Sequence, residues 1–319
     1  MTDKIAVMLC GQGSRDAAAT EEFNLLASEI RHRLTDYDIE SGFLEAAAPR
    51  VREGLDTLAE RNAERIVCIP GVLFPSQQIT KDLIAEVDKF SRAHAGLEVT
   101  LGRELSMDPR VLAVARDRIE QVELEARNHC TREETLLMVV GPGSDDSKVN
   151  SDVAKVSRLL WEGMGFGWAE VSYLGSASPS MELGLAKSVK LGFKRIIVFP
   201  CFLFSGEGVR RSHAAADDCA GAFPSVEVLK AGHLFHTGLL ADSLTDRIEE
   251  LLNGISNMNC QVCNYREQII STAHDHDHDH DHDHHHHHHH HHHHDHVHGH
   301  GHRHRHHNHG HGGGKADNS

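Results

Sequence analysis

The strongest constraint on the fold is an internal duplication: the chain of 319 residues repeats itself at an offset of 130 residues. The clearest matching segments are Gly11–Ser14 with Gly141–Ser144, Phe43–Pro49 with Tyr173–Pro179, Arg65–Pro70 with Arg195–Pro200, and Leu73–Phe74 with Leu203–Phe204. One register holds for all of them without a gap, and the period is too long for a solenoid repeat. The sequence therefore predicts two copies of one domain, residues 1–127 and 135–255, joined by a short linker.

Both copies predict the same alternation of strands and helices. Each begins with an apolar run typical of a buried strand, Ile5–Cys10 and Leu136–Val140, followed by a Gly-x-Gly-Ser turn and a helical pattern. Further strands are expected near Phe43 and at 171–174, at 66–70 and 196–200, and at 97–101 and 226–229, with helices after Pro49 and Pro179 and from near Lys81. This alternation favours an α/β fold: two duplicated domains, each a parallel sheet flanked by helices, facing each other across a cleft.

The expected ligand site lies beyond the carboxyl ends of the strands, where parallel α/β sheets bind their ligands. In the first copy this rule brings together the turn at 11–15 and a loop expected at 73–82, and in the second copy 141–146 and 204–212. A Gly-x-Gly-Ser turn is a weak signal by itself, because it can equally end a strand tightly or cradle a phosphate.

Composition argues against several classes of binding partner. A formal net charge of −15 with neutral histidines argues against nucleic acid or an anionic membrane as a partner. No apolar run approaches the roughly 18 residues of a membrane span. The start, Met-Thr-Asp-Lys, has neither the basic nor the apolar region of a signal peptide. We therefore expect a cytoplasmic protein, with monomer and homodimer both left open.

The segment 274–319 is rich in histidine and holds 25 of the chain's 31 histidines, first alternating with Asp and then in an unbroken run from His284 to His294. Neutral imidazole, with a pKa of about 6.5, binds Co²⁺, Ni²⁺, Zn²⁺ and Cu²⁺. With almost no apolar side chain to form a core, the segment is predicted to be a disordered metal-binding tail. Its first candidate ligands are His274, His276, His278, His280, His282 and His284. A purification tag is the alternative, but tags are short, uniform runs.

The seven cysteines fall into two groups. Five are scattered, mostly in apolar surroundings, and are expected to be small core residues: Cys10, Cys68, Cys130, Cys201 and Cys219. Cys260 and Cys263 instead form a Cys-x-x-Cys pair in the segment 256–273, just before the tail.

Six segments and the His-rich region carry a family resemblance. The segments are Cys10–Asp16, Phe43–Glu45, Pro70–Phe74, Asn150–Val156, Leu160–Glu170 and Met258–Gln268. From Ile5 to about Gln268 the chain resembles the long, two-domain sirohydrochlorin cobaltochelatases of cobalamin biosynthesis, in the class II chelatase superfamily. The resemblance implies a lyase that inserts Co²⁺ into sirohydrochlorin, a ring tetrapyrrole held in the cleft between the domains. Two pyrrole N–H protons leave as the ion enters, which calls for proton-accepting neutral ligands and a carboxylate.

The site implied by the resemblance departs from the family pattern at two positions. The family has a metal-binding, proton-accepting histidine in its first turn, Gly-His-Gly-Ser, and another in its second loop, whereas Gln12 and Gln78 stand there in this chain. A glutamine amide is a weak ligand for Co²⁺ and not a base at pH 7. Glu45 keeps the family's carboxylate. We expect Glu45, Gln12 and Gln78 at the catalytic centre, and Ser14 and Arg15 against the ring's carboxylates.

The second copy does not restore the missing pair, because Pro142 and Gly208 stand at the equivalent positions, although Glu207 is a further candidate carboxylate. Three histidines follow its second loop: His213, His233 and His236. A lone histidine in such a place is more often a hydrogen-bonded structural residue than a metal ligand.

The Cys-x-x-Cys pair also has two interpretations. Met258-x-Cys260-x-x-Cys263 resembles the iron–sulfur motif of the long chelatases, but two thiolates supply half of the usual four ligands. An iron–sulfur cluster therefore needs a second protomer or other ligands, and a redox-active or zinc-binding pair is the alternative.

Three functions remain open at this point. The chain inserts Co²⁺ with altered roles for Glu45, Gln12 and Gln78 and with metal supplied by the tail. Alternatively, it is an impaired homologue that binds tetrapyrrole or metal as a chaperone. The third alternative is a storage protein for nickel or cobalt.

Overall fold

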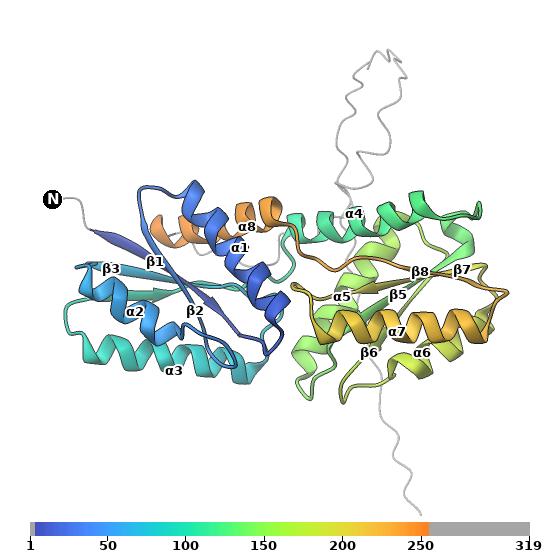
Figure 1. The fold of residues 1–319 in the computed structure, drawn as a ribbon, viewed down its shortest axis with the longest axis horizontal. Helices are drawn as coiled ribbons and strands as arrows, with labels where there is room; N and C mark the ends of the chain where they lie inside the picture. The colour runs from blue at the N-terminus through green and yellow to red at the C-terminus, as the bar shows by residue number, and fades with distance from the viewer. Residues whose placement is uncertain (1–3, 255–319) are drawn as a thin grey trace, which may run out of the picture. The chain divides into compact units, whose positions relative to one another are not determined.

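In the computed structural model, which describes residues 4–254, the chain forms two four-stranded parallel sheets (Figure 1). The first has the order β2-β1-β3-β4 and comprises β1 (Ile5–Gly11), β2 (Asp38–Phe43), β3 (Arg65–Pro70) and β4 (Glu98–Leu101). The second has the order β6-β5-β7-β8 and comprises β5 (Thr135–Gly141), β6 (Trp168–Tyr173), β7 (Arg195–Pro200) and β8 (Glu227–Lys230). The predicted α/β class and the duplication are confirmed.

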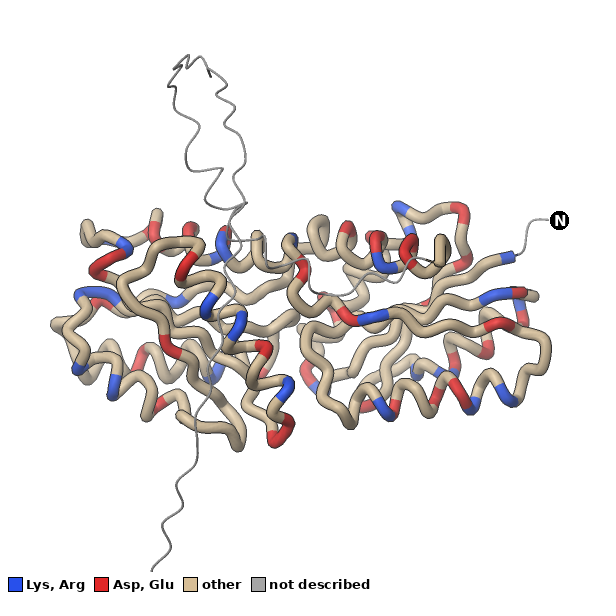
Figure 2. The backbone as a smooth tube through the Cα atoms, turned by 180° about the vertical axis from the view of Figure 1, so that it is seen from behind, with Lys and Arg blue, Asp and Glu red and all other residues tan. Residues whose placement is uncertain are grey.

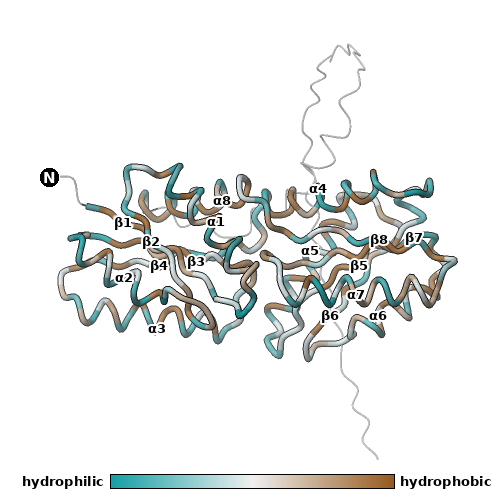
Figure 3. Tube along the Cα trace, in the orientation of Figure 1, coloured by the Kyte–Doolittle hydropathy of each residue, from teal (hydrophilic) through white to brown (hydrophobic). Residues whose placement is uncertain are grey.

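Helices cover both faces of each sheet because the central strands are apolar on both sides. Val7 and Leu9 of β1 face a core that includes α1 (Ala17–Arg33), whereas Ala6 and Met8 face α2 (Val51–Glu60) and α3 (Gln77–Ala93). In the second sheet α5 (Ser147–Met164) covers one face, and α6 (Met181–Ser188) and α7 (Glu207–Ala222) cover the other. Figure 3 shows hydrophobic residues along the central strands and hydrophilic residues interspersed along the helices.

The last helix of each copy packs on the other copy. α4 (Pro109–Glu125) lies against α5, β7 and β8 of the second sheet, and α8 (Thr237–Leu252) lies against α1 and β3 of the first (Figure 1). One hydrophobic core therefore runs through both halves, with contributions from α1, α4, α5 and α8. The expected boundaries 1–127 and 135–255 stay a prediction, but the exchange means that neither segment covers its own sheet alone.

Buried ion pairs and hydrogen bonds hold the exchanged helix α8 against the first half. Arg247 of α8 donates to Asp108, the N-cap of α4, at 2.8 Å, and the two side chains are 7% and 3% exposed. Asp108 also accepts a hydrogen bond from Ser243 at 3.0 Å. Arg103 pairs with Glu250 at 2.6 Å, again joining the first half to α8. Desolvated ion pairs need such additional hydrogen bonds to be tolerated.

One helix starts earlier than the sequence pattern predicts. α3 was expected from near Lys81 but begins at Gln77, because the Ser76 side chain accepts a hydrogen bond from the backbone N–H of Ile79 and caps the helix. Gln78, expected in a loop, therefore lies in the first helical turn. α7 likewise begins at Glu207, inside the loop expected at 204–212.

Several predictions concern residues outside 4–254. These are the Cys-x-x-Cys pair, Cys260 and Cys263, and the His-rich segment from His274, all of which lie outside the described residues. Over the described range, no helix combines the length and the apolar character needed to span a bilayer.

Candidate functional site

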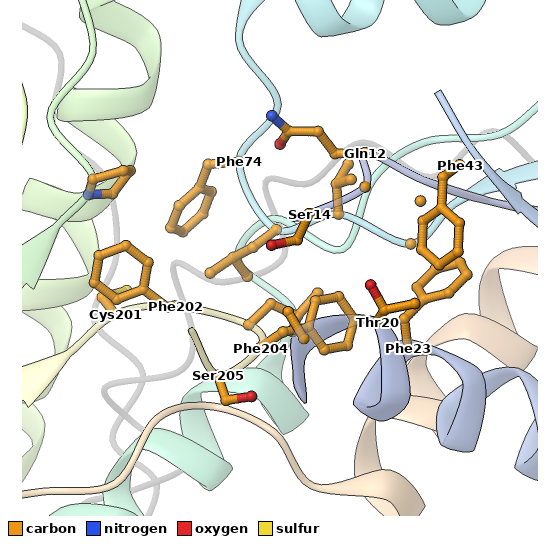
Figure 4. Close-up of a pocket in the computed structure, with 18 residues that line it drawn as sticks. Gln12, Ser14, Thr20, Phe23, Phe43, Phe74, Cys201, Phe202, Phe204 and Ser205 are labelled. Atoms are coloured by element: carbon orange, nitrogen blue, oxygen red, sulfur yellow. The ribbon is translucent and has the colours of Figure 1, made fainter. Parts of the chain in front are cut away.

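The carboxyl ends of β1, β3, β5 and β7 surround a cavity of about 290 Å³ that is lined by both halves (Figure 4). From the first half come the turn at 11–14, part of α1, Phe43 and the segment 71–74; from the second come Pro142 and the segment 201–205. The rule that placed a ligand site at this edge of each sheet therefore leads to one shared cavity rather than two.

Five phenylalanines contribute to the walls of this cavity. Phe23 packs against Phe43 with ring centroids 4.7 Å apart and against Phe204 of the other half at 5.9 Å. Figure 4 shows Phe23 and Phe43 together on one side, with Phe74 and Phe202 on the other. Such a cavity suits a flat, largely apolar ring, because aromatic side chains contribute large contact areas with defined stacking geometry.

A few polar groups interrupt the aromatic wall. They are the amide of Gln12 and the hydroxyls of Ser14, Thr20 and Ser205. The Ser205 hydroxyl is shielded from solvent and has no hydrogen-bond partner among the described residues, so it is available to a ligand. Burial raises the pKa of the Cys201 thiol to about 12, so this cavity-lining cysteine is protonated and a poor metal ligand at neutral pH.

The turn after β1 holds the backbone of Glu45 against Gln12. The N–H of Glu45 donates to the Gln12 carbonyl at 3.0 Å. Gly13 has φ +100°, and a Cβ there would lie 1.7 Å from the Glu45 carbonyl oxygen. Only glycine permits this approach.

The Glu45 side chain nevertheless lines a different hollow from that of Gln12. This second hollow, about 500 Å³, is also lined by Phe43, Ile79, Asp82 and Glu86. Phe43 borders both hollows.

Gln78 lies on the side of Glu45. Its Nε2 donates to Asp82 Oδ1 at 2.7 Å, and Asp82 lines the same hollow as Glu45. Arg15 lines a third hollow together with Ser14. The structure thus brings Gln12 and Ser14 into one cavity and Glu45 next to the Gln78–Asp82 pair in another, with Ser14 shared between the first and the third.

The candidates of the second half have mostly structural contacts. His213 Nε2 lies 2.9 Å from the Ala231 carbonyl oxygen, and the His236 side chain accepts from the N–H of Leu239 as the N-cap of α8. Glu207 pairs with Arg210 at 3.2 Å on the surface. His233 differs, because its Nε2 lies 3.0 Å from Glu22 of the first half. Glu22 also accepts from the backbone N–H of cavity-lining Ser205 at 2.6 Å.

Two equivalent aspartates join the halves, and sequence reasoning missed both. Asp16 is the N-cap of α1 and pairs with Arg210 of α7 at 2.6 Å; Asp146 is the N-cap of α5 and accepts from the backbone N–H of Gln77 at 2.6 Å. The Arg210 hydrogen bond lowers the pKa of Asp16, and the Gln77 and Lys148 N–H groups lower the pKa of Asp146. In the sequence they match at the 130-residue offset, each two residues after the Ser of a Gly-x-Gly-Ser turn.

A metal cluster is not preformed in this part of the chain. Within residues 4–254, no three His, Cys, Asp or Glu side chains gather closely enough to hold an ion.

Comparison with known proteins identifies similar chains over the same region. The sequence model of the CbiX family matches residues 6–122 and again 136–251. A sirohydrochlorin cobaltochelatase of Priestia megaterium is 33% identical over 266 residues, covering 82% of this chain and 84% of that protein. A sirohydrochlorin ferrochelatase of the same organism is 25% identical, covering 79% and 92%. Among solved structures, SirB from Bacillus subtilis with Fe³⁺ shares the fold with a TM-score of 0.66, 19% identity and coverage of 77% and 95%.

Proposed function

The chain belongs to the CbiX family, and from that membership we propose that it inserts a divalent metal ion, in the first place Co²⁺, into sirohydrochlorin for cobalamin biosynthesis. The observation that carries the proposal is the 33% identity to a sirohydrochlorin cobaltochelatase over 82% of the chain. The similarity to a sirohydrochlorin ferrochelatase at 25% identity supports sirohydrochlorin as the substrate more strongly than it supports Co²⁺ as the metal.

The cavity between the halves is suited to the macrocycle. Its aromatic wall can lie against the ring, and Gln12, Ser14 and Ser205 supply the few directional polar contacts that such sites use. At about 290 Å³ the cavity lies at the lower end of the range for small-molecule sites, so we expect a tetrapyrrole to widen it.

Proton transfer is assigned to Glu45. As the ion enters, two pyrrole N–H bonds break, both electron pairs stay on nitrogen and bind the metal, and two protons must leave. Glu45 borders the hollow on the far side of Phe43 and can accept a proton there once the ring displaces that side chain. Gln12 and Gln78 offer carbonyl oxygens to the ion but accept no proton at neutral pH. Ser14 and Arg15, which line a neighbouring hollow, are proposed to meet carboxylate groups of the ring.

The second candidate function is a tetrapyrrole- or metal-binding chaperone without insertion. The specific observation that favours it is the pair Gln12 and Gln78 where the family has histidine. The amide nitrogen of Gln78 also donates to Asp82 at 2.7 Å.

The deciding experiment mixes the purified full chain with metal-free sirohydrochlorin and Co²⁺ and follows the absorbance change of metallation. Insertion faster than the protein-free reaction supports the chelatase. Tight ring binding with no acceleration supports the chaperone, and no ring binding contradicts both. Repeating the assay with Fe²⁺ and Ni²⁺ tests the metal preference.

A further inference from the structure

Arg210 reaches from the second half to the turn that lines the shared cavity. Its Nη2 lies 2.6 Å from Asp16 Oδ2 and 3.2 Å from Glu207 Oε2. Asp16 is in turn fixed to the cavity wall, because its backbone N–H donates to Ser14 Oγ at 3.0 Å. The Arg210 side chain is 61% exposed, and neither ion pair uses its Nη1 or Nε.

The duplication supplies an internal comparison for this contact. Asp16 and Asp146 cap α1 and α5 in the same way, each with Oδ1 accepting from the N–H two residues further on. Each also directs Oδ2 across the interface, Asp146 to the backbone N–H of Gln77 and Asp16 to Arg210. The equivalent contact, made by Asp146, thus joins the two halves without a cation.

The residue equivalent to Arg210 at the 130-residue offset has no such reach. It is Thr80, whose hydroxyl donates to the Ser76 carbonyl within α3 at 3.0 Å. An arginine is therefore not needed to close this type of contact, and its presence on one side of the cavity calls for another explanation.

The net negative charge of the chain explains the presence of this arginine. The chain carries a net charge of −15, and acidic and basic residues are interspersed over both halves (Figure 2). A ligand bearing several carboxylates is repelled by such a protein unless cations are placed where it binds. Arg210 contacts Asp16 next to the cavity-lining turn and has unused donors. It meets this need, because a guanidinium pairs with a carboxylate through two parallel hydrogen bonds.

We propose that Arg210 binds a carboxylate side chain of the tetrapyrrole from the second half of the protein, and that Asp16 occupies this guanidinium until the ring arrives. The inference rests on the proposed ring substrate but not on metal insertion. Arg15 and Ser14 then hold the ring from the first half and Arg210 from the second, so the ring itself links the halves.

The test is a titration of the full chain with metal-free sirohydrochlorin, read from the absorbance of the ring. Arg210→Gln is expected to raise the Kd about tenfold, the size of one lost charge-assisted hydrogen-bonded contact. Arg210→Lys keeps the charge but not the paired donors and is expected to recover part of the affinity. Asp16→Asn retains a good helix cap and removes the competing charge, so it is expected to lower the Kd a few-fold.

Arg158→Gln is the matched control. Arg158 is 62% exposed and pairs with Glu162 within α5, so the variant removes the same charge and the same kind of contact away from the cavity. Its Kd is expected to stay within twofold of the wild type. Raising the salt concentration is expected to weaken ring binding more in the wild type than in Arg210→Gln.

Three outcomes overturn the inference. A wild type that binds the ring while Arg210→Gln does so equally well removes Arg210 from the site and leaves the proposed function intact. Equal losses in Arg210→Gln and Arg158→Gln reduce the effect to overall charge. A wild type that does not bind sirohydrochlorin refutes the proposed function, and this inference with it.

Discussion

At the scale of single residues, two glutamines stand where the family resemblance implies proton-accepting histidines. Gln12 lines the cavity between the halves, whereas Gln78 is held by Asp82 beside the hollow of Glu45. The proposed chemistry is therefore divided between two hollows that share Phe43. This division makes Glu45 the residue whose removal is most informative.

We expect Glu45→Gln to lower the insertion rate by about 10²–10⁴-fold, the usual contribution of a general acid–base group. Gln12→His with Gln78→His is expected to raise the rate, because neutral imidazole both binds Co²⁺ and accepts a proton near pH 7. Both are measured by sirohydrochlorin metallation. A fast wild type that is indifferent to Glu45→Gln would place the chemistry elsewhere.

Gly13 offers a second prediction at this scale. Gly13→Ala is expected to lower the free energy of unfolding by more than the ~1–3 kcal/mol of backbone strain, because the added Cβ also meets the Glu45 carbonyl at 1.7 Å. Gly96→Ala is the matched control, with φ +99° and nothing within 4 Å of its Cβ. Denaturant unfolding of the two variants separates strain from contact, and equal losses would contradict the close approach to Glu45.

At the scale of helices and strands, the exchanged helices α4 and α8 are the main feature. Each leaves its own copy and covers the sheet of the other, and the Arg247–Asp108 pair lies buried where they meet. The helices thereby hold the two walls of the cavity within one shared core.

We expect Arg247→Met to lower the free energy of unfolding by about 3–5 kcal/mol, because it leaves the carboxylate of Asp108 buried without its cation. Arg61→Met is the control. Arg61 pairs with Asp38 at 2.7 Å, but their side chains are 46% and 27% exposed, so we expect a loss under about 1 kcal/mol. Urea unfolding measures the loss of stability in both variants. Similar losses would argue against a special contribution of the buried Arg247–Asp108 pair.

The N-cap carboxylate of Asp146 makes the free energy of unfolding depend on pH. Its pKa is lowered from the ordinary value of 3.8, chiefly by the Gln77 N–H, so the carboxylate stabilises the folded state above about pH 4 and ceases to do so as the pH falls through the lowered pKa. The difference in unfolding free energy between wild type and Asp146→Asn is therefore expected to shrink from pH 7 to pH 3. An equal difference at both pH values would show that the Asp146 charge contributes nothing.

At the scale of the whole chain, the composition of the His-rich segment predicts that it binds several metal ions. Truncation after residue 273 is expected to reduce the number of Co²⁺, Ni²⁺ or Zn²⁺ ions bound per chain sharply, because 25 of 31 histidines are removed. Calorimetric titration measures the stoichiometry, and circular dichroism checks that the fold is retained. An unchanged stoichiometry would mean that the metal binds elsewhere.

The sequence by itself determined the two copies, their parallel strands and the sheet edge that carries the site. These features follow from local patterns: an apolar run such as Ile5–Cys10 is a strand buried on both faces, and a Gly-Ser turn after it marks the carboxyl end. Family resemblance added Gln12, Gln78 and Glu45 as candidates, and their roles stay predictions.

Only the tertiary structure decided how the two copies meet. The exchange of α4 and α8, the placement of Gln12 and Glu45 in different hollows, and the approach of Arg210 to Asp16 depend on residues that no local pattern connects. The physical reason is that periodicity identifies which face of an element is apolar, but not which surface covers it. Which surface covers an apolar face depends on the packing of the shared core. Both copies present similar apolar faces, and the chain buries the faces of one copy against the other copy.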